Sequence, residues 1–316
     1  MKILVTGGAG CIGSELVGRL LKEGNDVIVY DDFSTGKKEH LYEFKKNTKL
    51  KIVKGDIIDF KKLSKYAKNV DTVFHLAANS TVKFKENDPT EDILNINVTG
   101  TYNVLEAMRR GKARKIIFSS TSAVYGDTPE IPSTEKAPLM PISMYGATKA
   151  SGEHLIHAYC NLFDMKCWIF RFANIVGGKS RKSGTTIVPD FINKLRKNRN
   201  ELEILGNGLQ EKSYMTVDDC IDAMLFCYNK SRDEINIFNI GTGDVVTVTE
   251  IAEIIVKEMN LSKVEYRYTG GDRGWPGDMP QAILDITKLT CLGWRVKHKS
   301  RDSVSLAVKD AIRKGQ

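Results

Sequence analysis

A glycine turn between a strand and a helix constrains this chain more than any other feature. A short β-branched run at residues 2–6 breaks into Gly7-Gly-Ala-Gly10-Cys-Ile-Gly13, and a helical pattern follows over residues 14–23. This spacing of glycines permits a tight turn, a close approach of the backbone to a diphosphate, and packing of the helix on the strand. The helix N-terminus then offers free N–H groups to the anion. We therefore expect the chain to begin with a dinucleotide-binding unit.

The second strand, over residues 26–31, ends in an acid. Asp31 stands 18 residues after Gly13, where a carboxylate accepts hydrogen bonds from the ribose hydroxyls of adenosine and its charge repels the additional phosphate of NADP. This arrangement favours NAD. The alternative is an aspartate that only stabilises the turn before Asp32.

Strands and helices alternate through the first half of the chain. Further strands are expected at residues 50–55, 71–77 and 115–126, with helical segments near 61–68 and 88–110 between them. This alternation is typical of a parallel sheet covered on both faces. With 316 residues the chain exceeds a usual single domain. We predict an α/β fold, a doubly wound parallel sheet of the Rossmann type with a second, smaller α/β domain.

Tyr145 and Lys149 lie four residues apart in a helical run and so share one helix face. A nearby positive charge favours the phenolate and lowers the tyrosine pKa towards working pH, so Tyr145 could exchange a proton with a substrate hydroxyl. Such a pair also arises on solvated faces of a lysine-rich chain. The strand expected at 115–126 carries a group of hydroxyls that includes Ser119 and Thr121, which serve either as substrate hydrogen-bond donors or as strand-end caps.

Composition limits the remaining functions. The net charge of +8 comes from lysines in short scattered groups without interleaved aromatics, so we expect a solvated surface and no nucleic-acid binding. No apolar run reaches the roughly 18 residues of a membrane span, and no signal-peptide pattern precedes the first strand. We expect a cytoplasmic protein. The six cysteines lack metal-ligand spacing and are predicted to be reduced thiols, with no metal site.

Together these motifs resemble the extended short-chain dehydrogenase/reductases, and within them most closely the UDP-glucose 4-epimerases. The stretches that carry the resemblance are residues 6–13, 119–126, 145–149, 171–177, 206–219 and 275–280. The resemblance implies an NAD-binding domain at residues 1–172 with a returning segment at about 215–240. It also implies a nucleotide-sugar-binding domain at 173–214 and 241–316.

The resemblance also implies roles for individual residues. Tyr145 would be the catalytic base, Lys149 would anchor the nicotinamide ribose, and Thr121 would contact the sugar. The candidate cofactor-binding residues are Gly7, Gly10, Cys11, Ile12, Gly13, Asp31, Asp32, Asp56, Ile57, Ala77, Asn97, Ser119, Tyr145 and Lys149. The candidate substrate-binding residues are Thr121, Tyr145, Asn174, Lys212, Arg273, Asp278 and Ala282.

Several positions depart from related enzymes. Sugar-nucleotide dehydratases carry an acidic pair where this chain has Ser122-Ala123, and the decarboxylases usually carry a glutamate at position 123, so both activities are disfavoured. Lys212 stands where epimerases commonly have an arginine on the diphosphate, and Trp275 stands at the position of a second arginine. Arg273 is a nearby replacement.

By the same resemblance, Ala282 occupies a position that limits the room for the substituent on the sugar C2 atom. Enzymes restricted to glucose and galactose carry a bulky residue there, and those that accept N-acetyl sugars carry a small one. We therefore expect UDP-N-acetylglucosamine to enter as well as UDP-glucose.

The expected function is an NAD-dependent 4-epimerase of UDP-sugars that works through a transient 4-keto sugar. The alternatives are a 4-keto reductase of the same family and an NAD-sensing interaction protein without turnover. A homodimer is expected through the helices at 88–110 and 145–163. The basic, glycine-rich segment at 177–184 is expected to be a mobile lid or an exposed linker.

Overall fold

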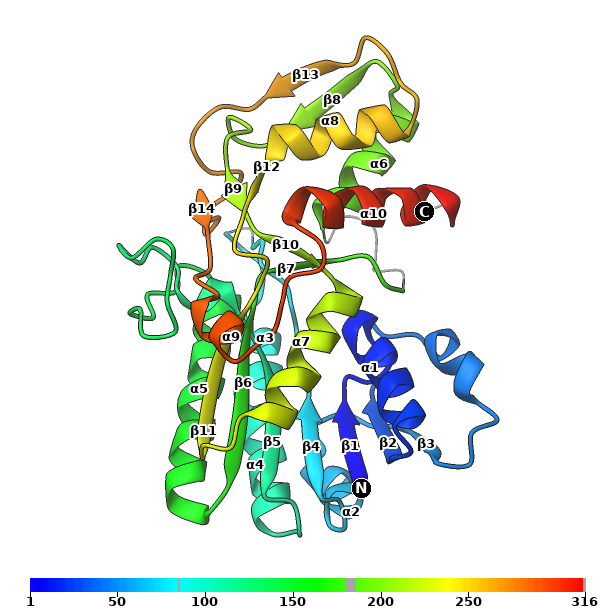
Figure 1. Ribbon diagram of the computed structural model, residues 1–316, viewed down its shortest axis with the longest axis vertical. Coiled ribbons are helices and arrows are strands. Elements are labelled where there is room, and N and C mark those ends of the chain that lie inside the picture. The colour runs from blue at the N-terminus through cyan, green and yellow to red at the C-terminus, as the bar shows by residue number, and fades with distance from the viewer. Residues whose placement is uncertain (85, 180–185, 315–316) are drawn as a thin grey trace.

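The computed structural model describes residues 1–84, 86–179 and 186–314, and a seven-stranded parallel sheet lies at its centre (Figure 1). The strands, in the order in which they lie across the sheet, are β11 (Ile235–Ile240), β6 (Lys166–Phe172), β5 (Lys115–Thr121), β4 (Thr72–His75), β1 (Lys2–Thr6), β2 (Asp26–Asp31) and β3 (Leu50–Lys54). The predicted doubly wound α/β fold is confirmed.

Helices cover both faces of this sheet. On one face lie α1 (Cys11–Lys22) and α7 (Val217–Lys230), and on the other lie α2 (Phe60–Ala67), α4 (Gly100–Arg109) and α5 (Met144–Phe163). Side chains alternate along a strand, so Ile3 and Val5 pack in the core under α1 while Leu4 packs under α4. Burial on both faces explains why the central strands are almost continuously hydrophobic.

The strand order reverses between β1 and β4, which are neighbours in the sheet. The chain leaves these two strands towards opposite faces, and ligands of open α/β sheets bind in the crevice that this reversal creates. The glycine turn after β1, the loop that begins at residue 76 and the end of β5 therefore share one edge of the sheet.

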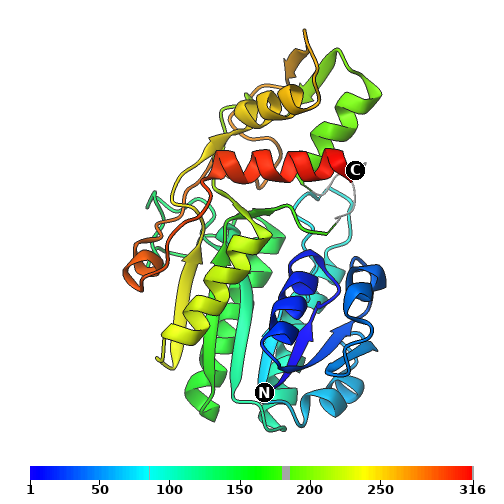
Figure 2. The same ribbon diagram turned by 45° about the vertical axis from the view of Figure 1, so that its right-hand side comes forward.

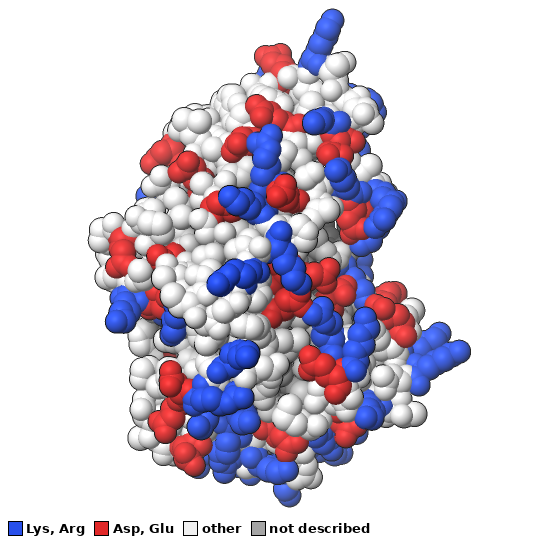
Figure 3. All heavy atoms as spheres, in the orientation of Figure 1, with Lys and Arg blue, Asp and Glu red and all other residues white. Residues whose placement is uncertain are grey.

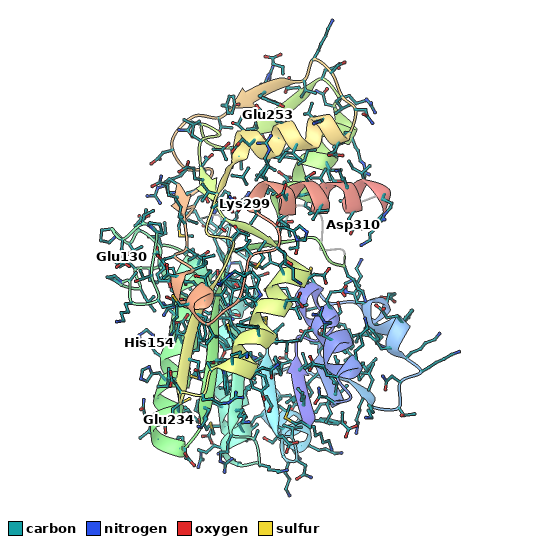
Figure 4. The ribbon with its side chains drawn as sticks, viewed as in Figure 1. Glu130, His154, Glu234, Glu253, Lys299 and Asp310 are labelled. Atoms are coloured by element: carbon teal, nitrogen blue, oxygen red, sulfur yellow. The ribbon has the colours of Figure 1, made fainter. Side chains whose placement is uncertain are left out.

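A second, smaller unit lies beyond that edge (Figures 1 and 2). Its helices are α6 (Ile187–Lys197), α8 (Val248–Glu258) and α10 (Ser300–Arg313), and its strands are β7 (Asn174–Val176), β8 (Glu201–Ile204), β9 (Glu211–Lys212), β10 (Tyr214–Thr216), β12 (Val246–Thr247), β13 (Glu265–Tyr268) and β14 (Gln281–Ala282). These elements enclose a hydrophobic core of their own, to which Ile192, Ile251 and Val304 contribute. Figure 4 labels Glu253 on α8 and Asp310 on α10.

We propose the domain boundaries predicted above, 1–172 with 215–240 against 173–214 with 241–316. The separate core of the smaller unit supports them. The tail also returns to the large sheet, because Leu289 of α9 (Thr287–Cys291) and Trp294 are buried in the core beneath α7.

The remaining elements are short. The predicted helix at 88–110 is formed by α3 (Glu91–Leu94), a π-helical turn η2 (Asn95–Thr99) and α4, and two 3-10 helices are η1 (Lys38–Phe44) and η3 (Ser122–Val124). Within the described residues, no helix is both long enough and apolar enough to cross a membrane. Both signs of charge are interspersed over the face seen in Figure 3. Most of the segment predicted to be a lid, from residue 180 onward, lies outside the described residues.

Candidate active site

The glycine turn is held in a conformation that larger residues could not adopt. Gly7 has a φ of +71°, and a Cβ atom there would lie 2.6 Å from the backbone nitrogen of Ala77. A Cβ at Gly13 would lie 2.2 Å from the carbonyl oxygen of Gly7. Helix α1 then begins after Gly10 without a side-chain cap among the described residues. Its first N–H groups therefore form a cradle that fits a diphosphate.

Asp31 supports this turn from the end of β2. Its carboxylate accepts hydrogen bonds from the backbone N–H of Ala9 at 2.9 Å and of Phe33 at 2.8 Å, and its side chain is buried. Burial raises the pKa of Asp31, and the two backbone bonds oppose that change. Asp32 instead accepts hydrogen bonds from Ser34 in a local turn. The predicted ribose contacts of both acids stay predictions.

Three other predicted cofactor residues line the same edge or support it. Asp56 accepts a hydrogen bond from the N–H of Ile58 at 2.9 Å, and Ile57 is buried in the core. The N–H of Ala77 points to the hydroxyl of Thr6, 3.4 Å away. Their contacts with a cofactor remain predictions.

Asn97 ties the loop after β4 to α5. Its Oδ1 atom accepts from the N–H of Asn79 at 2.8 Å, while Nδ2 donates to the Asn79 carbonyl at 2.9 Å and to Thr148 Oγ1 at 3.0 Å. Because the side-chain amide is occupied by protein partners, any effect on the cofactor would pass through the position of Asn79.

The end of β5 supplies the predicted hydroxyl groups. Thr121 is partly exposed and its Oγ1 accepts from the N–H of Ala123 at 3.2 Å, whereas Ser119 donates to the carbonyl of His75 at 3.3 Å. His75 itself is fully buried between the hydroxyls of Thr6 and Thr101, at 2.7 and 3.0 Å. Burial first, and the charge of Lys149 second, lower its pKa to about 3. His75 is thus a core histidine whose two ring nitrogens are satisfied by protein hydroxyls.

Helix α5 brings Tyr145 and Lys149 to this edge. The helix is capped by Ser143, whose hydroxyl accepts from the N–H of Gly146 at 3.1 Å. A Cβ at Gly146 would lie 2.3 Å from the Ala123 carbonyl oxygen, so the first turn of α5 packs directly on the segment after Thr121. Tyr145 is partly exposed and Lys149 is buried.

The buried amine of Lys149 lies 4.0 Å from the centre of the Phe118 ring. Burial lowers the pKa of Lys149 to about 7, and the carboxylate of Glu153 opposes the change. The amine of Lys149 therefore loses its proton far more readily than that of an exposed lysine. Its influence on a neighbouring phenol depends on pH in the same range.

A buried ion pair between Glu153 of α5 and Arg171 of β6 was missed from the sequence. The Arg171 guanidinium donates to both carboxylate oxygens, at 2.7 to 3.2 Å. It also donates to the Tyr125 hydroxyl at 3.0 Å, which in turn donates to Asn239 of β11 at 2.6 Å. Ser120 of β5 donates to Glu153 as well.

One feature of the sequence could have indicated this ion pair. Glu153 stands one helical turn after Lys149 on the same face, and a carboxylate there needs a buried partner.

One cluster in the smaller unit holds four of the predicted substrate residues, namely Lys212, Arg273, Asp278 and Ala282, while Thr121 and Tyr145 lie at the edge of the large sheet. Lys212 pairs with the buried carboxylate of Asp278, and strand pairing sets Ala282 beside Lys212. Arg273 donates to Asp127 at 3.2 Å and to the Asp278 carbonyl at 2.8 Å.

Asn174 lies at the start of β7, and its amide donates to the carbonyl of Ser213, the residue after Lys212, at 3.2 Å. The two predicted diphosphate cations, Lys212 and Arg273, are therefore already engaged by protein carboxylates.

A glycine cradle at the switch point of a parallel sheet, with a Tyr-x-x-x-Lys helix beside it, defines a dinucleotide-dependent enzyme of the Rossmann class. The model of the NAD dependent epimerase/dehydratase family matches residues 3–241. The chain belongs to that family, as its resemblance predicted, and its cofactor is NAD.

The comparisons with individual proteins span the whole chain. It is 33% identical over 321 residues to the UDP-glucose 4-epimerase of Mycolicibacterium smegmatis, with 100% of both chains covered. A crystal structure of a UDP-galactose 4-epimerase superposes with a TM-score of 0.88 at 37% identity, covering 99% of each chain. The UDP-glucuronic acid decarboxylase 4 of Arabidopsis thaliana is 30% identical over 318 residues, which are 98% of this chain and 68% of that protein. Membership thus covers more than one reaction on sugar nucleotides.

Replacing Lys149 with Met should raise the melting temperature of the nucleotide-free protein at pH 7. The native pKa of about 7 lies below the roughly 10.4 of an unfolded lysine, so burial of the amine costs stability. Between these values the unfolded chain binds a proton that the native protein lacks, and wild-type stability rises with pH. The advantage of Lys149→Met should therefore shrink as pH rises from 7 to 10.

Thermal unfolding monitored by circular dichroism measures this change. The matched control is Lys257→Met at an exposed lysine of α8, which should leave the melting temperature within about one degree of wild type at each pH. A lower melting temperature for Lys149→Met at pH 7 would contradict the expectation.

Proposed function

We propose that the chain is an NAD-dependent 4-epimerase that interconverts UDP-glucose and UDP-galactose through a transient 4-keto sugar. The observation that carries the proposal is the composition of η3. This turn packs beside the start of α5 and offers Ser122 and Ala123, without the carboxylates that elimination or decarboxylation would use. The names of the epimerases to which the chain is similar agree with this choice.

In the proposed mechanism Tyr145 takes the proton of the sugar C4 hydroxyl and later returns it. Bound NAD supplies the acceptor and donor of hydride at C4. Thr121, at the end of β5, hydrogen-bonds the same sugar oxygen. Lys149, held beneath this edge, keeps positive charge near the phenol and so favours its deprotonated form.

Inversion requires the 4-keto sugar to present its other face before hydride returns. The nucleotide stays bound by the smaller unit while the sugar turns, and no cofactor is consumed in a complete cycle. Retention of the cofactor distinguishes this reaction from that of a 4-keto reductase.

Tyr145→Phe should lose about 10²- to 10⁴-fold in turnover, because general acid–base catalysis contributes that much. The variant should retain NAD, since the glycine cradle is unchanged. NMR of the products from UDP-glucose measures the first effect, and the nucleotide content of purified protein measures the second. Tyr42→Phe, at an exposed tyrosine of η1, is the matched control and should keep full activity.

Full activity of Tyr145→Phe would contradict the proposed role of Tyr145 as the catalytic base. Stoichiometric formation of NADH by the wild-type protein would show that it is a 4-keto-forming oxidoreductase and not an epimerase.

The proposed substrate range includes UDP-N-acetylglucosamine and UDP-N-acetylgalactosamine. Ala282 lines a narrow pocket with Ser122 and Tyr125, directly after the end of β5. A small side chain at this point obstructs an acetamido group less than a bulky one would. Ala282→Tyr should therefore reduce turnover of UDP-N-acetylglucosamine about tenfold or more relative to UDP-glucose.

Competition between the two sugars in one NMR assay measures that ratio, with Ala282→Gly as the control that should leave it unchanged. An equal loss for both sugars would contradict the proposed role of Ala282. A wild-type protein that rejects the acetylated sugar would contradict the wider range.

We also propose a homodimer formed through α4 and α5. Large apolar side chains are exposed on and around these neighbouring helices: Leu94 at 49%, Tyr102 at 45%, Leu162 at 71% and Phe163 at 37%. Tyr102 of α4 packs edge-on against Tyr159 of α5, and Tyr159 packs edge-on against Phe163 at the end of the same helix. An apolar patch of this kind is typical of an interface.

Tyr102→Glu should convert the dimer to a monomer in multi-angle light scattering, because it would bury an unpaired charge in the two-fold contact. Leu306→Glu, at an exposed leucine of α10, is the control and should leave the mass unchanged. A monomeric wild type or a dimeric Tyr102→Glu would refute the arrangement.

A further inference from the structure

Lys83 reaches across from the large sheet to the smaller unit. It lies in the loop after β4, and its Nζ atom is 4.2 Å from the centre of the Trp275 ring. Trp275 belongs to the loop between β13 and β14, and Lys212 Nζ lies 5.0 Å from the same ring. Two ammonium groups therefore gather at one indole where the two parts of the molecule face each other.

The other cationic side chains near Lys83 are paired with carboxylates. Lys194 of α6 pairs with Asp190 at 3.5 Å and with Glu203 at 3.2 Å. As described above, Lys212 and Arg273 are likewise engaged by carboxylates. These pairs neutralise most of the positive charge in the cluster.

Lys83, by contrast, has no carboxylate within ion-pair distance in the described part of the chain. Lys83 is solvent-exposed as a residue, and partial burial of its amine is the main cause that lowers its pKa, with Asp190 and Asp278 acting in the opposite direction. The indole Nε1–H of Trp275 is also buried and has no hydrogen-bond partner among the described residues. Among the described residues these two donors thus lack a protein acceptor, and a ligand oxygen would supply one.

The cluster lies next to the candidate catalytic helix. A Cβ on Gly277, in the same loop as Trp275, would lie 3.0 Å from the Ile142 carbonyl oxygen and 3.5 Å from Ser143 Cβ. Ser143 caps α5 two residues before Tyr145. The loop that carries Trp275 therefore packs against the start of the helix that carries Tyr145.

We propose that Lys83 is a substrate-binding residue whose ammonium pairs with an oxyanion of the nucleotide sugar. The assignment rests on the proposed function in taking a nucleotide sugar as the substrate. A charge-assisted bond to an oxyanion is stronger than the cation–π contact with Trp275, so the ligand displaces or shares the ammonium. Two groups of such a ligand have this chemistry, the diphosphate and the C6 carboxylate of a glucuronic acid sugar.

Titration calorimetry on the NAD-loaded protein with UDP, UDP-glucose, UDP-glucuronate and uridine tests the assignment. Lys83→Met should weaken binding of the ligands that carry the relevant oxyanion about 10- to 100-fold and leave uridine unchanged. Lys83→Arg, which keeps the charge, should stay within a few-fold of wild type. Lys194→Met removes a charge from the same cluster and is the matched control, expected to change binding less than threefold.

The pattern of losses identifies the group. A loss for UDP and for both sugars assigns Lys83 to the diphosphate, and a loss for UDP-glucuronate alone assigns it to the carboxylate. Binding of all three ligands by Lys83→Met within twofold of wild type overturns the proposal. An equal loss of uridine, or a wild type that binds none of the three, also overturns it. If UDP binding depends on Lys83 but no sugar is epimerised, the proposed function fails and the assignment of Lys83 stands.

Discussion

The ion pair between Glu153 and Arg171 holds the candidate site in one geometry. Two charges in a protein core cost several kcal/mol each in lost hydration unless their hydrogen bonds are satisfied, and removal of one partner typically costs about 3–5 kcal/mol. Here the Arg171 guanidinium donates hydrogen bonds to the Glu153 carboxylate, the Tyr125 hydroxyl and the Glu135 carbonyl. The hydroxyl of Ser120 donates a further bond to the carboxylate. The network thereby joins α5, β5, β6 and β11. The helix of Tyr145 and the strand end of Thr121 are consequently fixed relative to each other.

Lys149 of α5 is also buried, but unlike Arg171 it has a lowered pKa. It is as deeply buried as Arg171, but its pKa falls to about 7 because burial outweighs the attraction of Glu153. An amine kept at such a cost to folding is characteristic of functional sites, where perturbed pKa values accompany chemistry. One carboxylate thus neutralises an arginine for stability and moderates a lysine for function.

Much of this was predictable because the signals are local. The glycine spacing from Gly7 to Gly13 follows from backbone geometry that no larger residue could satisfy, and hydrophobic runs bounded by turns gave the parallel strands. The helix pairing Tyr145 with Lys149 needed only the spacing of four. Asn97 could not be interpreted from the sequence in this way. Its amide hydrogen-bonds to Asn79 and Thr148, and these contacts exist only because the loop after β4 packs against α5. The Glu153–Arg171 pair was missed for the same reason.

The amino-acid sequence alone determined the doubly wound sheet, its nucleotide-binding edge and the family, since periodicity, glycine spacing and short motifs are properties of neighbouring residues. The tertiary structure decided which charges are satisfied. Lys212 and Arg273, the cations predicted at the diphosphate, pair with Asp278 and Asp127, whereas Lys83 faces Trp275 with no such carboxylate in the described part of the chain. Ion pairing depends on distances between segments far apart in the chain, and only the packing of the two parts of the molecule sets those distances.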